Sequence, residues 1–316
     1  MKAWQVRAHG GVEALALSEV PPPVPGAGEM RVRVAAAGLN FSDLLMIAGR
    51  YQVRPPLPFV PGQEVAGVVE RCDSGTFRVG EGIASKVTWG GFAESAIVRE
   101  DMALRLPKEI DAAAGATLPV VWPTAWIALF ERARLQAGET VLILAAAGGT
   151  GLAAVQLAKS AGAQVIAAVG SPDKFALCRE HGADVVLDYS VAGWAEKVRG
   201  VDVLFDPVGG EVTDVALKTL GRGGRLLLVG FSSGTIPAIR ANRLLLKNAS
   251  ALGVYWSHEL DAPLLERAFA DMWRRHANGG LRFSADRRYR FADLPQALAD
   301  MAARRTTGKN VLTVPE

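Results

Sequence analysis

The sequence has few of the side chains that bind metals or form covalent cross-links. Its 316 residues include two cysteines, Cys72 and Cys178, and four histidines. Two isolated thiols form neither a CxxC pair nor a disulfide framework, so a reduced compartment is expected. The histidines are scattered and show no spacing typical of metal ligands.

A large excess of charge of one sign is also missing. There are 35 basic and 32 acidic residues, a net charge of +3. This balance gives no reason to expect a nucleic acid or a membrane surface as a partner. The first residues, Met1 to Gln5, lack the apolar core of a secretory signal, and we predict a cytoplasmic protein.

The stretch Thr140–Ala168 organises the rest of the chain. It reads as a buried strand over 141–144, a glycine-rich turn, a helix and a second strand over 165–169. Residues 140–158 carry no charge, but a transmembrane helix is excluded because three glycines interrupt them. Such a unit binds a dinucleotide with its pyrophosphate at the helix N-terminus, although a tight turn without a ligand is the alternative.

The flanking regions differ in pattern, and the length suggests two domains. The N-terminal part indicates a small β domain with strands over 30–36, 65–70, 79–84 and 92–98. After the glycine turn, strands over 184–187, 201–205, 224–230 and 252–255 alternate with helices, which is typical of a doubly wound parallel sheet. The C-terminal part predicts helices, one of them over 294–303 behind an Asp293–Gln296 capping box, and a last strand over 308–314.

The order of several motifs resembles the medium-chain dehydrogenase/reductase superfamily, and within it the zinc-free quinone oxidoreductases, the group that includes zeta-crystallin. The motifs are Gly38-Leu39-Asn40-Phe41-Ser42-Asp43, Pro61-Gly62-Gln63-Glu64-Val65-Ala66-Gly67, Gly90-Gly91-Phe92-Ala93-Glu94, Thr124-Ala125-Trp126, the glycine turn, and Gly308-Lys309-Asn310-Val311-Leu312. The resemblance implies an α/β fold with a Rossmann domain over 119–258. It also implies a GroES-like, β-rich substrate domain made of 1–118 and 259–316, with the active site in the cleft between the domains. Homodimers that meet at the last Rossmann strand are common in this family.

Two departures from related sequences bear on the chemistry. The places that hold zinc ligands in the zinc alcohol dehydrogenases look like Asn40 and Gln63 here, and neither is a good zinc ligand. We therefore predict an enzyme without a metal that stays active in a chelator. Leu45 stands where quinone reductases of the family often carry a tyrosine, which implies a more apolar substrate pocket.

Without a metal, hydrogen bonds must polarise the substrate carbonyl. Asn40 can donate through its amide and Tyr51 through its hydroxyl, while Asp43 is expected to orient Asn40 or a water. Asn40 and Asp43 could instead be a pair that caps a helix. Tyr51 could instead serve only to pack against its neighbours. Glu64 is expected to orient the local structure.

The resemblance and the glycine turn together predict a cofactor site. The turn contributes Gly148, Gly149, Thr150 and Gly151. Thr124 and Asn310 match family positions near the cofactor, and Phe231 and Ser232 follow the carboxyl end of a strand, where doubly wound sheets bind ligands.

The end of the second Rossmann strand favours NADPH over NADH. No acidic residue stands at its tip to bind a ribose 2′-OH; Gly170, Ser171 and Lys174 stand there instead. Tyr189 matches a family position that touches the 2′-phosphate. The segment also reads as an ordinary helix start, and Asp173 is the residue that would let NADH compete.

These residues predict hydride transfer from NADPH to a quinone or another electron-poor acceptor. One alternative is a 2-enal, enone or enoyl-thioester reductase of the same superfamily. The other is an NADPH-binding protein with a structural or regulatory role, as in some zeta-crystallin-like proteins.

Overall fold

The computed structural model describes residues 1–315, which fall into two compact units. Unit 1 comprises Met1–Val120 and the residues from Phe283 onward, and unit 2 comprises Val121–Arg282. The boundaries expected from the sequence were 118 and 258, so the second division lies later than expected. Helix α8 (His258–Ala277) belongs to unit 2, where the indole N–H of Trp126 donates to Asp271 of this helix at 2.8 Å.

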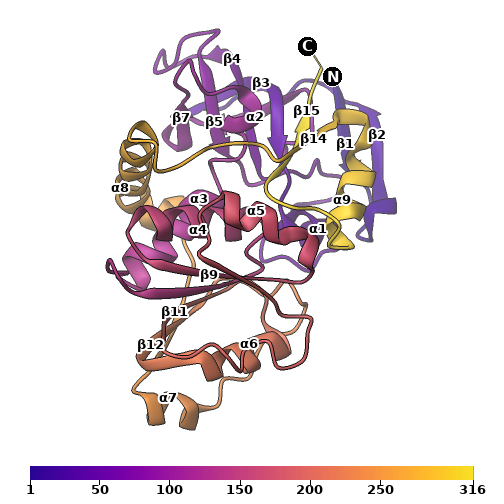
Figure 1. The fold of residues 1–316 in the computed structure, drawn as a ribbon. Helices are drawn as coiled ribbons and strands as arrows, with labels where there is room; N and C mark the ends of the chain where they lie inside the picture. Colours follow the sequence, from indigo (N-terminus) through magenta and orange to yellow (C-terminus); the bar gives the residue numbers. More distant parts are fainter. Residues whose placement is uncertain (316) are drawn as a thin grey trace. The chain divides into compact units, whose positions relative to one another are not determined.

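Unit 2 is a six-stranded parallel sheet with helices on both faces (Figure 1). Its strands are β8 (Thr140–Leu144), β9 (Gln164–Val169), β10 (Val185–Asp188), β11 (Val201–Asp206), β12 (Leu220–Leu228) and β13 (Ser250–Gly253). Their spatial order, β10-β9-β8-β11-β12-β13, is the 3-2-1-4-5-6 order of the dinucleotide-binding fold. This confirms the predicted Rossmann domain.

The helices of unit 2 cover the sheet because its strands are apolar on both sides. β8, for example, is buried from Val141 to Leu144. The helices are α3 (Val121–Trp126), which continues as a π-helical turn (Ile127–Arg132), α4 (Gly149–Ser160), α5 (Phe175–Glu180), α6 (Gly210–Ala216), α7 (Ala241–Lys247) and α8. In Figure 1, α4 and α5 lie on one face of the sheet and α6 and α7 on the other.

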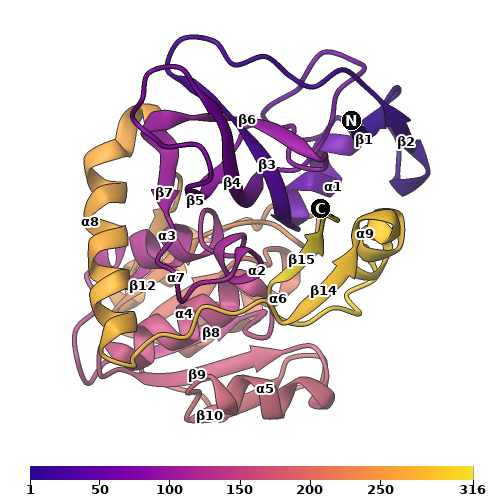
Figure 2. The same ribbon diagram turned by 90° about the horizontal axis from the view of Figure 1, so that it is seen from above.

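Unit 1 contains a seven-stranded, mostly antiparallel sheet and a two-stranded ribbon (Figure 2). The strands are β1 (Lys2–Val6) and β2 (Leu15–Glu19) in the ribbon, and β3 (Glu29–Gly38), β4 (Glu64–Cys72), β5 (Gly82–Lys86), β6 (Ser95–Arg99), β7 (Ala103–Arg105), β14 (Arg287–Arg290) and β15 (Asn310–Thr313) in the sheet. The helices are α1 (Phe41–Ile47), α2 (Ala112–Gly115) and α9 (Leu294–Ala302). This is the predicted β-rich domain built from both ends of the chain.

One strand pairing of unit 1 matters for the site. β15 pairs antiparallel with β3, and Val311 lies opposite Gly38. The backbone N–H of Leu39 also donates to the Asn310 carbonyl at 2.9 Å. The C-terminal segment is thereby placed beside the residues that lead into α1.

Local details differ from the sequence-based expectations. The Asp293 side chain forms an ion pair with Arg290 at 2.8 Å and does not cap α9, so the predicted capping box is wrong. An arginine three residues earlier competes for the same carboxylate. The strand expected over 79–84 begins only at Gly82, because a turn occupies 78–81. Among residues 1–315, no helix is long and apolar enough to cross a membrane.

Candidate active site

A cluster of buried polar side chains lies where β3, α1, β4 and β15 of unit 1 meet. Asn40 is the N-cap of α1, Asp43 lies in its first turn, Glu64 begins β4, and Lys309 directly precedes β15. All four side chains are less than one-tenth exposed. Ionisable groups are buried in this way only where they have partners, so each contact of the cluster is informative.

Asn40 and Asp43 form a capping contact at the start of α1. The backbone N–H of Asn40 donates to Asp43 Oδ2 at 2.8 Å. The other carboxylate oxygen, Asp43 Oδ1, is buried and has no hydrogen-bond partner among the described residues. The helix-capping pair was the alternative interpretation from the sequence, and α1 begins with such a capping box; the Asn40 side chain also bonds to Glu64 and Lys309.

Burial raises the pKa of Asp43 from 3.8 to about 7. Loss of hydration is the main cause, and the negative charge of Glu64 acts in the same direction. The backbone N–H of Asn40 and the positive charge of Lys309 oppose this rise of the pKa. Near neutral pH, Asp43 therefore exists in both protonation states, and its neutral form can donate a hydrogen bond.

The Asn40 side chain lies between two oppositely charged groups. Its Nδ2 donates to Glu64 Oε1 at 2.8 Å, and its Oδ1 accepts from Lys309 Nζ at 2.7 Å. Lys309 Nζ also forms a short ion pair with Glu64 Oε1. Gly38 makes room for this carboxylate, because a Cβ at that position would lie 2.3 Å from Glu64 Oε1. Sequence reasoning had given Glu64 a local orienting role and had missed Lys309.

The places that hold zinc ligands in related dehydrogenases carry amide side chains in this chain. Gln63 Oε1 accepts a short hydrogen bond from Ser42 Oγ, and Asn40 is held as described above. Among the described residues, no group of three or more His, Cys, Asp or Glu side chains is arranged to hold a metal ion. The absence of a metal from the reaction remains a prediction, tested below.

Tyr51 lies in the loop after α1 and is partly buried. It packs against the apolar core of unit 1 that also contains Leu39, Met46 and Phe59. The structure thus shows Tyr51 packed in the core, which was the alternative to a role in catalysis. That the Tyr51 hydroxyl donates a hydrogen bond to the substrate stays a prediction.

The protonation of Asp43 should make the stability of the protein depend on pH. The folded state holds this proton up to about pH 7, whereas the unfolded state loses it near 3.8. Between these values the folded state binds more protons, so the free energy of unfolding should fall as pH rises and level off above pH 7. At 1.36 kcal/mol per pKa unit the total is at most about 4 kcal/mol. Denaturant titrations at several pH values measure this fall.

The matched comparison is Asp43→Asn, which keeps an oxygen acceptor for the Asn40 N–H and cannot ionise. The pKa of Asp206 is also raised by burial. Its effect on the unfolding free energy is the same in the parent and the variant, so it cancels in their difference. The difference in unfolding free energy between Asp43→Asn and the parent should therefore grow in favour of the variant from pH 4 to pH 7. A difference that stays constant over this range would contradict the assignment.

In unit 2, the turn between β8 and α4 has the shape needed to receive a phosphate. Gly148 is the N-cap of α4, and no side chain among the described residues caps this helix end. Its first-turn N–H groups are therefore left for another acceptor. A Cβ on Gly151 would lie 2.4 Å from the Ala145 carbonyl oxygen, so only glycine fits this close approach. Gly149 and Thr150 open the helix, and the four residues fit the pyrophosphate of a dinucleotide.

Of the residues predicted to read the adenosine 2′ position, Gly170 and Tyr189 lie together at the ends of β9 and β10, and Ser171 and Lys174 follow Gly170 in the chain. Tyr189 N–H donates to the Val169 carbonyl at 2.8 Å. A Cβ on Gly170 would stand 3.4 Å from the Tyr189 hydroxyl, in ordinary contact. Ser171 caps the 3-10 turn Pro172–Lys174. The Ser171 hydroxyl also lowers the pKa of Asp173 by hydrogen bonding to its carboxylate, so Asp173 is held by its neighbour.

The remaining predicted cofactor residues fall in different places. The Thr124 hydroxyl accepts from the Trp256 indole N–H at 2.9 Å. Phe231 and Ser232 follow β12 of unit 2, and the Phe231 side chain is exposed. Asn310 belongs to unit 1, where its Oδ1 is buried without a partner among the described residues.

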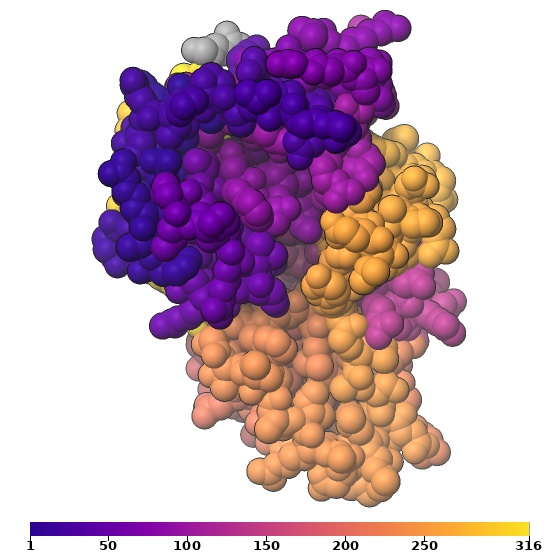
Figure 3. Space-filling model, turned by 180° about the vertical axis from the view of Figure 1, so that it is seen from behind, coloured from indigo at the N-terminus to yellow at the C-terminus, as the bar shows by residue number. Residues whose placement is uncertain are grey.

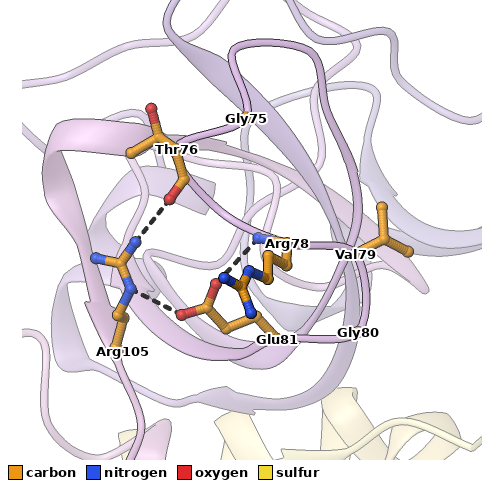
Figure 4. Close-up of a pocket in the computed structure, with 7 residues that line it drawn as sticks. All are labelled: Gly75, Thr76, Arg78, Val79, Gly80, Glu81 and Arg105. Atoms are coloured by element: carbon orange, nitrogen blue, oxygen red, sulfur yellow. Dashed lines mark hydrogen bonds and ion pairs between the residues drawn. The ribbon is translucent and has the colours of Figure 1, made fainter.

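A concavity on unit 1 does not involve these residues. It has a volume of about 610 Å³ and lies along the turn between β4 and β5 (Figure 4). Arg105 projects into it, but its guanidinium donates to Glu81 Oε1 and to the Thr76 carbonyl, both at 2.7 Å. Two donors of this arginine are thus used within the protein, and we assign no function to this concavity.

Comparison with known proteins agrees with this geometry. The model of the alcohol dehydrogenase GroES-like domain matches residues 26–108, and that of the zinc-binding dehydrogenase family matches 149–274. Quinone oxidoreductase-like protein 2 of Mus musculus is 35% identical over 313 residues, covering 96% of this chain and 89% of the mouse protein. The quinone oxidoreductase of Pseudomonas aeruginosa is 35% identical over 326 residues, covering 98% of this chain and 99% of that protein.

A solved structure is similar over the same length. The quinone oxidoreductase of Thermus thermophilus, determined alone and in complex with NADPH, has a TM-score of 0.86 and 36% identity, and the match covers 99% of this chain and 100% of that one. The chain belongs to the medium-chain dehydrogenase/reductase superfamily, in its zinc-free quinone oxidoreductase group. It is a quinone oxidoreductase-like enzyme, as the motif order predicted.

Proposed function

We propose that this NADPH-dependent oxidoreductase delivers a hydride to a quinone, with the Asn40 amide polarising the acceptor carbonyl in place of a metal. The observation that supports this most directly is the setting of Asn40. One hydrogen of its Nδ2 is bonded to Glu64, and the second has no acceptor among the described residues. A buried, preoriented N–H donor stabilises negative charge that develops on a carbonyl oxygen.

The cofactor and the two units would have separate roles in this reaction. NADPH, when bound, supplies the hydride. The α4 N-terminus and the Gly148–Gly151 turn would hold its pyrophosphate, and Lys174 and Tyr189 would hold its 2′-phosphate. Asn40 and Tyr51 would orient and polarise the acceptor, and Asp43 would hold a proton near neutral pH.

The test is NADPH oxidation, followed by absorbance, with a panel of quinones, enones and enoyl thioesters. We expect the highest kcat/KM with a quinone and no loss of rate in EDTA. Activity that disappears with the chelator and returns with added zinc would contradict the metal-free site. No oxidation with any acceptor, together with tight NADPH binding, would favour a binding protein without catalytic function.

Reduction of an enone or enoyl thioester is the second candidate. Leu45, in α1 two residues after Asp43, is half-buried and apolar where related quinone reductases often carry a tyrosine. An apolar side chain there favours an acceptor with a hydrocarbon chain. A kcat/KM for medium-chain enones above that for every quinone would decide for this candidate.

We further propose that the chain forms a homodimer through the free edge of the unit 2 sheet. β13 is the last strand of this sheet, and exposed edges of this kind pair with other strands. Leu245, Leu246, Tyr255 and Leu260 nearby are each more than two-thirds exposed. The orange segment of unit 2 that contains them lies at the surface in Figure 3.

Light scattering after gel filtration should give twice the mass of the chain, 33.4 kDa. Tyr255→Asp should shift the mass toward the monomer, because a charge in an apolar interface is costly. The control is Val24→Asp, an equally exposed apolar position in unit 1. A parent protein that runs as a monomer, or an equal effect of both variants, would overturn this proposal.

A further inference from the structure

Lys309 is a buried lysine of the candidate active site, and it lies far from the other members in sequence. Its Nζ donates to the Leu39 carbonyl at 2.9 Å and to Asn40 Oδ1 at 2.7 Å. Its third partner is Glu64 Oε1, in a short contact. A lysine ammonium has three donors and no acceptor, so all of its hydrogen-bonding capacity is used at this one place.

The backbone around Lys309 is held on both sides, which fixes where its side chain starts. Its N–H donates to Asp286 Oδ2 at 2.7 Å, and its carbonyl accepts from the Asp286 N–H at 2.9 Å. Gly308 has φ +62, and a Cβ there would lie 2.0 Å from Asp286 Cγ. Glycine at 308 therefore permits the close approach of Asp286, whose hydrogen bonds hold the Lys309 backbone in place.

The charges on either side of Asn40 permit only one orientation of its amide. Lys309 can only donate, so it faces Oδ1, and the ionised Glu64 carboxylate can only accept, so it faces Nδ2. A rotation by a half-turn would set the NH₂ group against the ammonium and the oxygen against the carboxylate. Both contacts would then be repulsive in a buried site, where charges are poorly screened.

We propose that Lys309 is a positioning residue which, with Glu64, locks the Asn40 amide so that its second N–H always faces the acceptor carbonyl. The inference rests on the proposed function of Asn40. The competing role for the Lys309–Glu64 pair is the stability of unit 1 alone. The two roles differ in what happens to Asn40 when Lys309 is replaced.

The first test is a double-mutant cycle between Lys309→Met and Asn40→Ala. If Lys309 acts through Asn40, Lys309→Met should lower kcat by about tenfold to a hundredfold through misplacement of the donor. It should leave the Kd of NADPH unchanged, and it should lower kcat no further in the Asn40→Ala background. Lys108→Met, at an exposed lysine of the same unit, is the control and should match the parent.

The second test observes the amide itself and does not depend on activity. In protein made with isotopically labelled asparagine, the Asn40 side-chain resonances are assigned by their loss in Asn40→Ala. In the parent they should exchange slowly with solvent, and in Lys309→Met they should exchange faster and broaden. Where Lys309→Met fails to fold because Glu64 is left unpaired, the variant Lys309→Met/Glu64→Gln removes both charges, and the same changes are expected.

The outcomes separate the two proposals. Asn40 resonances unchanged in the Lys309 variants, or kcat effects that multiply in the cycle, overturn the positioning role. A lower melting temperature with unchanged kcat and unchanged resonances assigns Lys309 to stability only. A third outcome is altered Asn40 resonances in the Lys309 variants together with the parent kcat in Asn40→Ala. Lys309 would then hold the amide, but the proposed catalytic function of Asn40 would be wrong, and so would the catalytic role of Lys309.

Discussion

Replacing Asn40 with alanine is expected to lower kcat by about 100-fold with every accepted substrate, because one oriented donor to a developing oxyanion contributes about this much. Tyr51→Phe should have an effect of the same direction and order, since it removes only the hydroxyl. The dissociation constant of NADPH should stay near the parent value, because both side chains belong to unit 1 and the predicted pyrophosphate and 2′-phosphate residues belong to unit 2. Steady-state kinetics and fluorescence titration with NADPH measure the two quantities.

Each variant needs a neighbour as a control. Gln52→Ala alters an exposed side chain next to Tyr51 and should keep the parent kcat. Ser42→Ala removes the hydrogen bond to Gln63 beside Asn40 without touching the Asn40 amide, and its effect should be small. If Asn40→Ala and Tyr51→Phe both reduce all acceptors at the parent rate, the proposed acceptor site is wrong.

Lys174→Ala should weaken NADPH binding by about ten- to a hundredfold and leave NADH binding unchanged. A charge-assisted hydrogen bond to the 2′-phosphate contributes roughly 1.5–3 kcal/mol, and NADH lacks this phosphate. Lys174 ends the 3-10 turn Pro172–Lys174 that follows Gly170 and Ser171, and Gly170 lies in contact with Tyr189. Its neighbour Asp173, the residue that could favour NADH, is engaged with Ser171.

Isothermal titration of parent and variant with both nucleotides tests this assignment. Lys197→Ala, at an exposed lysine of the same unit, controls for the loss of one positive charge. A parent protein that binds NADH more tightly than NADPH would refute the preference. An equal loss of affinity for both nucleotides in Lys174→Ala would show that the lysine does not contact the 2′-phosphate.

The sequence by itself determined the fold class and the cofactor turn, because their signals are local. The apolar run Val141–Leu144, the glycines at 148, 149 and 151, and the next strand form one continuous stretch whose geometry follows from neighbouring residues. The regular alternation of strands and helices then fixed the parallel sheet of unit 2. The family followed from the order of the motifs, and the comparisons confirmed it.

Only the tertiary structure decided which polar groups share hydrogen bonds. The Asp293 carboxylate had two suitable partners nearby, and in the structure it pairs with Arg290 and not with the helix end. Lys309 stood in a motif recognised from the sequence, and a lysine at the start of an apolar strand is a hint of burial. Its partner Asn40 is nevertheless separated from it by 269 residues. The two meet because β15 pairs with β3, and such a pairing depends on the packing of the whole unit, which no local pattern specifies.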